Sequence, residues 1–124
     1  MFKTINRDEL DRMISSGEKF KLVDVLAKDS FEKEHIRCSI SLPLNEIEEK
    51  AGQEFRKDEA IVVYCASFEC QASTMAAKKL AEMGFKNVYD YKGGIRDYKE
   101  GDISLEGSLY ETTFHAASTC SCCL

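Results

Sequence analysis

Residues 61–65 (Ile-Val-Val-Tyr-Cys) decide the fold, because they combine β-branched and aromatic side chains and carry no charge. A continuous apolar run of this kind is typical of a strand that is covered on both faces. Helix-forming residues follow at 73–83 (Ser-Thr-Met-Ala-Ala-Lys-Lys-Leu-Ala-Glu-Met), and Gly84 is placed to end that helix. We therefore predict a buried strand, then a loop over residues 66–73, then a long helix that begins at Ser73.

Strand and helix signals alternate along the rest of the chain. Short apolar runs predict further strands at residues 2–5, 21–26, 39–42 and 87–91. Helices are expected at residues 6–14, 30–35, 45–50 and 95–100. Asn6 followed by Glu9 has the spacing of a capping box, and Ser30 can cap the second helix. Strands separated by helices predict a three-layer α/β fold, in which about five mainly parallel strands lie between helices on both sides.

The whole chain has the composition of a globular domain. With 124 residues, 44% hydrophobic and 31% charged, it has room for one core and differs from a disordered segment. The longest stretch without charge or strong polarity, residues 60–66, is too short for a transmembrane helix, and residues 1–12 lack the apolar core of a signal peptide. The net charge of −5 argues against nucleic acid and anionic membranes as partners. We therefore expect a cytoplasmic protein that binds neither.

The cysteine content also bears on function, and the six cysteines stand at positions 38, 65, 70, 120, 122 and 123. Without an export signal, this number indicates thiol chemistry or metal binding rather than a disulfide framework. The alternation of strand and helix signals fades from Gly101 onward. We therefore predict a domain at residues 1–106 and a flexible, cysteine-rich tail at residues 107–124. The close spacing of Cys120, Cys122 and Cys123 fits a zinc site poorly. The tail is either a segment with exposed thiols or a sulfur relay.

Cys65 is the main candidate for a catalytic residue, because it ends the buried strand. Sites of parallel α/β sheets form at the carboxyl ends of strands, next to helix N-termini. A loop there can point several backbone N–H groups inward, and with the helix dipole they would lower the pKa of a thiol. The candidate loop consists of Ala66, Ser67, Phe68, Glu69, Cys70, Gln71, Ala72 and Ser73. From the residues alone, Cys65 is either a reactive thiol of this kind or an inert buried cysteine.

The order and spacing of these elements resemble a single-domain rhodanese over about residues 4–100. The motifs that carry the resemblance are Leu22-Val23-Asp24-Val25, Glu34-His35-Ile36, Ser39 to Pro43, Ile61 to Cys65, Gly84-Phe85, Asn87-Val88-Tyr89 and Gly93-Gly94-Ile95. The resemblance implies a rhodanese-like fold and a sulfurtransferase in which Cys65 carries a persulfide and the loop binds the sulfur anion. It implies structural roles for Asp24 and His35, and it implies no metal and no organic cofactor.

The length and charge of the loop depart from the usual rhodanese pattern. The loop is two residues longer, and Ala72 stands where the family often has an arginine, so no basic residue occurs between Cys65 and Ser73. Thiosulfate is a dianion that an arginine fork binds well, so we expect thiosulfate to be a poor donor here. A persulfide or polysulfide is the expected donor of sulfane sulfur, and a thiol, on a small molecule or a protein, is the expected acceptor.

Cys70 is a further departure, and it creates a Cys-x4-Cys loop that resembles a subgroup of rhodanese-like proteins. A second thiol in the same curled loop can attack a persulfide on Cys65, which releases sulfide and leaves a disulfide. Cys70 is therefore either a resolving thiol or a small packing residue. Two other functions stay open: a dithiol redox or polysulfide-reducing protein that uses Cys65 and Cys70, and a non-catalytic binding module. Phosphatase chemistry is not expected, because Gln71 replaces the arginine that such a loop needs.

Overall fold

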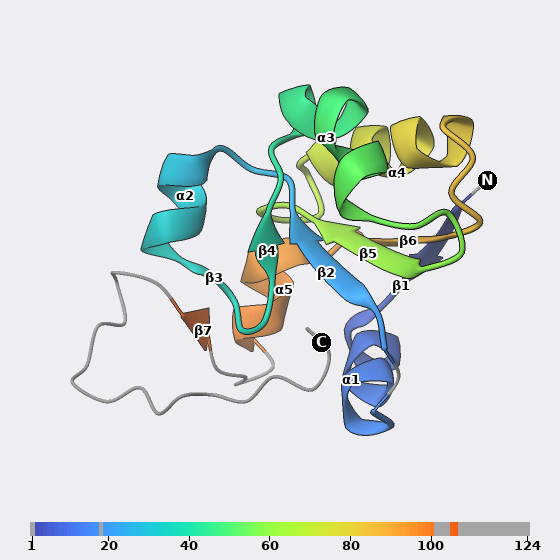
Figure 1. Ribbon diagram of the computed structural model, residues 1–124. Coiled ribbons are helices and arrows are strands. Elements are labelled where there is room, and N and C mark those ends of the chain that lie inside the picture. Colours follow the sequence, from blue (N-terminus) through green and yellow to red (C-terminus); the bar gives the residue numbers. More distant parts are fainter. Residues whose placement is uncertain (1, 18, 101–104, 107–124) are drawn as a thin grey trace.

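The structure is a computed structural model that describes residues 2–17, 19–100 and 105–106. Its main sheet has the strand order β1-β6-β5-β2-β4, and every neighbouring pair in it is parallel. The strands are β1 (Phe2–Ile5), β2 (Lys21–Asp24), β4 (Ile40–Ser41), β5 (Ala60–Tyr64) and β6 (Asn87–Tyr91). The predicted α/β fold with about five strands is confirmed, and β5, the strand that decides the fold, lies at the centre of the sheet (Figure 1).

Helices cover both faces of this sheet, with α3 and α4 on one side and α1 and α5 on the other (Figure 1). The helices are α1 (Arg7–Ser15), α2 (Lys28–Lys33), α3 (Ile47–Glu54), α4 (Ala72–Glu82) and α5 (Gly94–Glu100), and a 3₁₀ turn η1 (Leu44–Glu46) precedes α3. Side chains alternate along β5, so Ile61 and Val63 face α3 and α4, whereas Val62 and Tyr64 face α1 and α5. Cys65 continues the first series and belongs to the α3–α4 side of the core.

Of the two helix caps predicted from the sequence, one is confirmed and one is wrong. The capping box of α1 is confirmed, because Asn6 Oδ1 accepts a hydrogen bond from the Glu9 amide at 2.8 Å and Glu9 Oε1 accepts one from the Asn6 amide at 2.9 Å. The prediction that Ser30 caps α2 is wrong. The N-cap is Ala27, which has no capping side chain, and Ser30 lies inside the helix. The pattern for α1 was sufficient because both capping partners lie within one turn.

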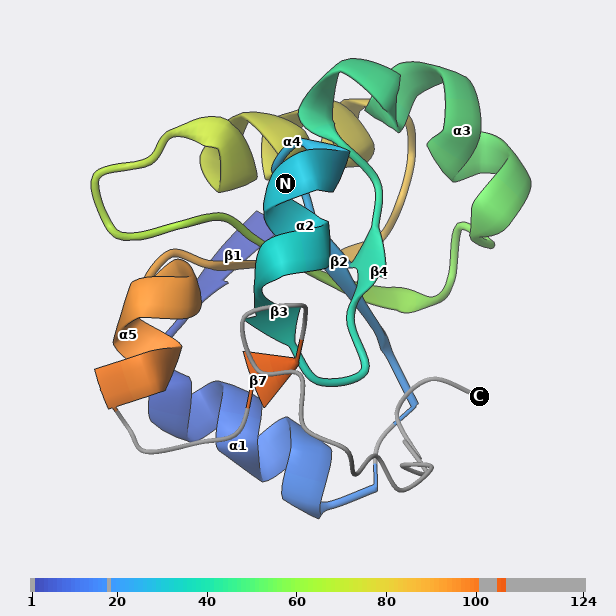
Figure 2. The same cartoon turned by 90° about the vertical axis from the view of Figure 1, so that its left-hand side faces the viewer.

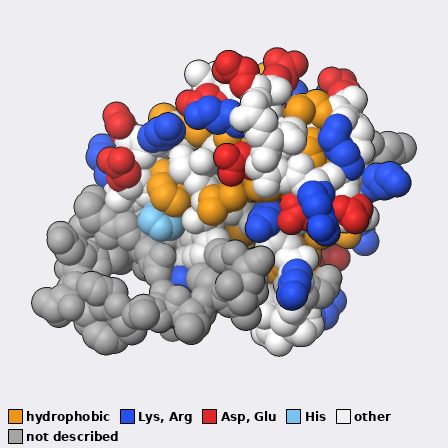
Figure 3. All heavy atoms as spheres, viewed as in Figure 1, with side chains coloured by type: hydrophobic (Ala, Val, Ile, Leu, Met, Phe, Trp, Pro, Cys, Tyr) orange, Lys and Arg blue, Asp and Glu red, His pale blue; other side chains and the backbone are white. Residues whose placement is uncertain are grey.

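A second, two-stranded sheet pairs β3 (His35–Ile36) with β7 (Leu105–Glu106) in antiparallel orientation. The predicted tail at residues 107–124, including Cys120, Cys122 and Cys123, lies outside the described residues, so the domain boundary stays a prediction. On the face shown in Figure 3, acidic and basic side chains are interspersed, with small hydrophobic areas between them. Within the described ranges, no helix combines the length and the apolar character that crossing a membrane requires.

Candidate active site

Cys65 lies directly after β5, at the carboxyl end of the central strand of the sheet. Its side chain is fully buried, with 0% of its surface exposed, on the α3–α4 side of the core. β2 and β6 flank β5 and hold it in register, with Asp24 and Tyr91 on either side of Tyr64. Both faces of β5 are covered, so only the ends of the strand are open to loops. Cys65 is the first residue beyond the carboxyl end, and a loop can therefore surround it.

The loop of residues 66–73 curls back over the Cys65 sulfur. In Figure 2 the loop (yellow-green) runs out from the end of β5 and turns back to α4. The Cys65 thiol donates a hydrogen bond to the Cys70 carbonyl oxygen at 3.5 Å and a longer one to the Ser67 carbonyl oxygen at 3.9 Å. The Cys70 amide donates to the same Ser67 oxygen at 3.1 Å. These bonds close the loop into a turn whose tip, at Phe68 and Glu69, is exposed.

The loop residues differ in burial, and only some of them face the sulfur. Ala66, Phe68, Glu69 and Gln71 are exposed, Ser67, Cys70 and Ala72 are half-buried, and Ser73 is buried. α4 begins at Ala72, one residue before the predicted start, so Ser73 lies in its first turn. The Ser73 hydroxyl is buried and lacks a hydrogen bond of ordinary geometry within the described residues. The structure therefore brings Cys65, Cys70 and Ser73 together and leaves Phe68 and Glu69 at the rim.

The two thiols of the loop differ in acidity. Burial raises the pKa of Cys65, a hydrogen bond with Cys70 raises it further, and the Ser73 hydroxyl and amide offset these effects only in part. The prediction of a lowered pKa at Cys65 is therefore wrong for the closed loop. Burial also acts to raise the pKa of Cys70, but hydrogen bonds from the Cys65 thiol and from the Ala66 and Ala72 amides lower it below its usual value. Of the two thiols, Cys70 is therefore the more readily deprotonated.

Lys92, in the turn between β6 and α5, places a positive charge at the loop. The sequence analysis did not predict this contact. Its Nζ donates a hydrogen bond to the Cys70 carbonyl oxygen at 3.2 Å, and its charge contributes to the lowered pKa of Cys70. The register explains the contact, because Tyr64 pairs with Tyr91 and the next positions along the two strands are Cys65 and Lys92. The sequence shows that Lys92 follows a strand, but it does not show which strand lies beside it.

The start of α5 holds the first residues of the loop. The Ile95 amide donates to the Cys65 carbonyl oxygen at 3.0 Å, and the Arg96 amide donates to the Ala66 carbonyl oxygen at 2.9 Å. Gly94 approaches so closely that a Cβ atom there would collide with the Cys65 carbonyl oxygen, and its φ of 65° also favours glycine. These contacts therefore fix the backbone at the nucleophile candidate.

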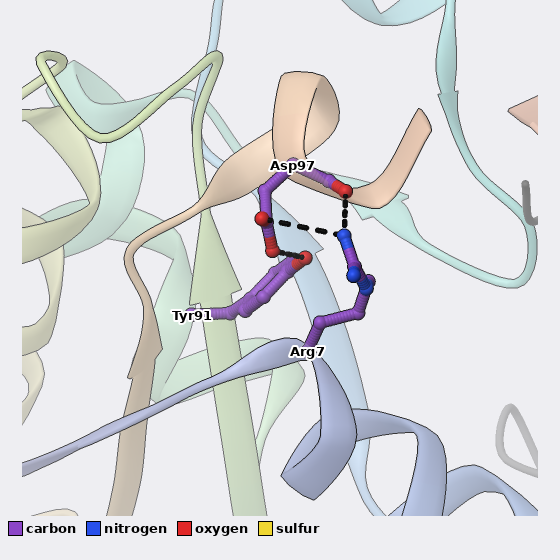
Figure 4. A network of polar contacts seen from close by, with 3 residues as sticks. All are labelled: Arg7, Tyr91 and Asp97. Carbon is purple, nitrogen blue, oxygen red and sulfur yellow. Dashed lines mark hydrogen bonds and ion pairs between the residues drawn. The ribbon is translucent and has the colours of Figure 1, made fainter. Parts of the chain in front are cut away.

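A polar network holds α5 in place (Figure 4). The Tyr91 hydroxyl donates to Asp97 Oδ2 at 2.6 Å. Arg7 Nη1 donates to the Asp97 carbonyl oxygen at 2.6 Å and lies 3.4 Å from Asp97 Oδ1. Because Arg7 begins α1 and Tyr91 ends β6, Asp97 ties the helix that supports the loop to two other elements.

Asp24 and His35, the two residues predicted to support the structure, have contacts that fit this role. Asp24 is buried at the end of β2, and its Oδ1 accepts a hydrogen bond from the Leu26 amide at 2.9 Å. Burial raises the pKa of Asp24 to about 6, although the Leu26 bond opposes this shift. His35 stacks on Phe31 with ring centroids 3.9 Å apart. Among the described residues, no three His, Cys, Asp or Glu side chains gather in a way that could hold a metal ion.

The chain was compared with known protein families, with curated proteins and with solved structures. Residues 6–101 match the rhodanese-like domain family. Thiosulfate sulfurtransferase GlpE of Coxiella burnetii is 30% identical over 99 residues, which cover 80% of this chain and 89% of GlpE. The protein named "Putative sulfur carrier protein YrkF" of Bacillus subtilis is 31% identical over 94 residues, but this chain spans only 49% of its length. The crystal structure of the BH2092 protein from Bacillus halodurans superposes with a TM-score of 0.80 at 30% identity, over 93% of this chain and 85% of that one.

Proposed function

The chain belongs to the rhodanese-like family, and we propose that it is a sulfurtransferase that carries sulfane sulfur as a persulfide on Cys65. One observation carries the proposal: Cys65 ends the central strand inside a curled loop that leads to α4 and holds a second thiol. The names of GlpE, "Thiosulfate sulfurtransferase", and of YrkF, "Putative sulfur carrier protein", support the class of reaction.

Sulfur transfer on Cys65 would take place in two half-reactions. In the first, the Cys65 thiolate attacks the terminal sulfur of a hydropersulfide or hydropolysulfide, a new S–S bond forms, the donor's S–S bond breaks, and the donor leaves as a thiolate. In the second, an acceptor thiolate attacks the outer sulfur, and Cys65 leaves as a thiolate. Cys65 has to lose its proton first, and the Cys70 side chain, which interacts with the Cys65 thiol and has the lowered pKa, can accept that proton when it is itself deprotonated.

Access to Cys65 requires the loop to open, because the sulfur is fully buried in the closed loop. The tip at Phe68 and Glu69 is exposed, so this is the part of the loop that we expect to move. The carbonyl groups of Cys65 and Ala66 are tied to α5 and stay in place. We therefore expect donors to reach Cys65 from the side of the loop on which Cys70 lies.

The charge of the loop supports a persulfide or polysulfide as the donor and a thiol as the acceptor. Residues 66–73 include Glu69 and no basic side chain, so a dianion such as thiosulfate finds no bidentate partner there and is a poor donor. Cys65 and Cys70 are both free thiols, so both are available for sulfur exchange, and a cytoplasmic location stays part of the proposal. The partners in this proposal are the sulfur donor and the thiol acceptor, without a membrane or nucleic acid.

The pairing of the two thiols favours a second candidate function, the reduction of polysulfide by a dithiol. In this reaction the Cys70 thiolate attacks the Cys65 sulfur of the persulfide, a Cys65–Cys70 disulfide forms, and sulfide leaves. The two thiols lose two electrons and the sulfane sulfur gains them, so an external thiol must reduce the disulfide before the next turnover. A non-catalytic binding module is the remaining alternative.

A steady-state assay with two donors tests the proposal. We expect sulfur to pass from inorganic polysulfide to an excess acceptor thiol, with a kcat/KM at least about tenfold above that for thiosulfate, because one missing charge-assisted contact costs about 1.5–3 kcal/mol. Saturation by thiosulfate at micromolar concentration would contradict the donor class. Sulfide release that stops after one turnover without reductant would favour the dithiol function, and no transfer from either donor would favour the binding module.

A further inference from the structure

A positive charge reaches the thiol loop from outside it, and the proposed function does not account for this charge. Lys92 follows β6, and its ammonium group lies at the Cys70 carbonyl oxygen. We infer that Lys92 is the specificity-determining cation of the site and attracts monoanionic sulfane donors, such as hydropolysulfide, to the Cys65–Cys70 pair. This inference rests on the proposed sulfurtransferase function and specifies the class of its donor.

The geometry groups the ammonium and both thiols around one carbonyl group. The Cys70 carbonyl oxygen accepts a hydrogen bond from Lys92 Nζ at 3.2 Å and another from the Cys65 thiol at 3.5 Å. Lys92 is half-buried, so its charge is less screened than that of a lysine on the open surface. Within the described residues, no other basic side chain donates a hydrogen bond to residues 65–73. Among the described residues, Lys92 is therefore the basic residue whose side chain is bonded to this loop.

The chemistry of lysine suits a monoanion better than a dianion with a fixed shape. An ammonium group is a compact point charge, whereas the planar fork of an arginine matches an oxyanion with two parallel hydrogen bonds. Hydropolysulfide ends in a single charged sulfur, so a single point charge can bind it without two parallel hydrogen bonds. Burial acts to raise the pKa of Cys70, hydrogen bonds from the Cys65 thiol and the Ala66 and Ala72 amides lower it, and the charge of Lys92 adds a smaller effect in the same direction.

A purely structural role for Lys92 makes a different prediction. If its hydrogen bond only holds the Cys70 carbonyl group, its loss loosens the loop and changes the reaction with charged and uncharged reagents alike. If its charge attracts anions, its loss slows anionic reagents selectively. Iodoacetate and iodoacetamide separate the two roles, because they alkylate thiols by the same displacement of iodide and differ in charge.

The experiment measures alkylation rates of Cys65 and Cys70 by peptide mapping in the full chain. For Lys92→Gln, we expect the ratio of the iodoacetate rate to the iodoacetamide rate to fall roughly fivefold, the factor that corresponds to one partly screened charge pair. Lys92→Arg keeps the charge and should keep the ratio. Lys86→Gln removes the same charge just before β6, at the opposite end of the strand, and should leave the ratio unchanged.

The functional arm uses the same variants with inorganic polysulfide as donor. Lys92→Gln should raise the KM for polysulfide roughly fivefold, with Lys92→Arg close to the wild type. An unchanged alkylation ratio in Lys92→Gln, or an equal loss with both reagents, would overturn the inference. Alkylation does not depend on sulfur transfer, so a reduced ratio in a protein that forms no persulfide would reject the proposed function and leave Lys92 as an anion-attracting residue.

Discussion

At the scale of single residues, the candidate site holds two cysteines in one loop that differ in burial and acidity. Cys65 is fully buried and its pKa is raised, whereas Cys70 is half-buried and its pKa is lowered. Burial disfavours a thiolate, and hydrogen bonds to the sulfur favour it. The more exposed thiol is thus the more acidic one, and the buried thiol is the one at the end of the central strand.

Cys70→Ser tests the role of the second thiol. We expect sulfur uptake by Cys65 to persist, because its position depends on β5 and α5 rather than on Cys70. The Cys65 persulfide should then accumulate, and sulfide release without added thiol should stop, because the intramolecular attack is lost. Persulfide lifetime and sulfide release, measured side by side with the wild type, check this. Equal lifetimes in the two proteins would make Cys70 a packing residue.

Asp24→Asn should change the pH dependence of stability. The pKa of Asp24 is about 6 in the folded protein, chiefly because of burial, against 3.8 for an unperturbed carboxyl. Since the folded pKa is raised, the contribution of protonated Asp24 is complete below about pH 4 and is lost as the pH rises through 6. Relative to Asp24→Asn, the wild type should lose up to about 3 kcal/mol of unfolding free energy between pH 4 and pH 7.

Urea unfolding of both proteins at several pH values in this range measures the difference. Other titrating groups contribute equally to the two proteins, so only the difference between them reports Asp24. If the unfolding free energies of the wild type and Asp24→Asn changed in parallel with pH, they would contradict a buried Asp24 with a raised pKa.

At the scale of elements, α5 holds the start of the candidate loop in place. Its first amides bind the Cys65 and Ala66 carbonyl groups, and Gly94 lets the two backbones approach. This contact joins the end of β5 to a helix that begins 29 positions further along the chain (94 − 65). No local sequence pattern indicates such a contact.

Gly94→Ala should therefore damage the site. The new Cβ would collide with the Cys65 carbonyl oxygen and would lie 2.9 Å from the Ala66 carbonyl carbon, and alanine also disfavours a φ of 65°. We expect a loss of stability of about 2 kcal/mol or more and a larger loss of sulfur transfer. Gly52→Ala in α3, where a Cβ would meet no atom within 4 Å, is the control and should be neutral or stabilising by up to about 1 kcal/mol. Full activity in Gly94→Ala would contradict the role assigned to this contact.

At the scale of the whole molecule, the Arg7–Asp97–Tyr91 network joins the first helix to the last helix described in the main domain (Figure 4). Asp97→Ala removes the carboxylate that accepts the Tyr91 hydrogen bond and lies 3.4 Å from Arg7, whereas the bond from Arg7 to the backbone carbonyl of residue 97 stays. It should destabilise the protein by about 1–3 kcal/mol. Tyr91→Phe should cost less when added to Asp97→Ala than alone, because the acceptor of its hydroxyl is already gone.

Asp58→Ala is the matched control for this prediction. Asp58 pairs with Arg56 on the open surface, where both side chains are more than two-thirds exposed, so its loss should change stability by less than about 1 kcal/mol. Thermal or urea unfolding compares the four variants. A loss in Asp58→Ala as large as that in Asp97→Ala would show that the network contributes nothing specific.

The parts of the molecule that could be predicted from sequence are those whose signal is local. Three features have such a local signal: the strand at residues 61–65, the capping box at Asn6 and the helix near Ser73. The candidate thiols lie at the end of that strand and in the loop that follows it. The contact between Lys92 and the loop could not be predicted from the sequence, because it depends on the register between β5 and β6. The raised pKa of Cys65 depends on the burial that the folded loop creates, and spacing along the chain carries no information about it.

Mass spectrometry that locates the transferred sulfur decides whether Cys65 is its carrier. The protein is incubated with inorganic polysulfide, alkylated and digested with trypsin, and the peptide of residues 58–78, which contains both loop thiols, is sequenced by mass spectrometry. The account predicts an added mass of about 32 Da, one sulfur atom, on Cys65 in the wild type and in Cys70→Ser. Cys65→Ser should show no added sulfur in this peptide while keeping its fold and thermal midpoint. Sulfur on Cys70 with Cys65 unmodified, or undiminished sulfur transfer by Cys65→Ser, would contradict it.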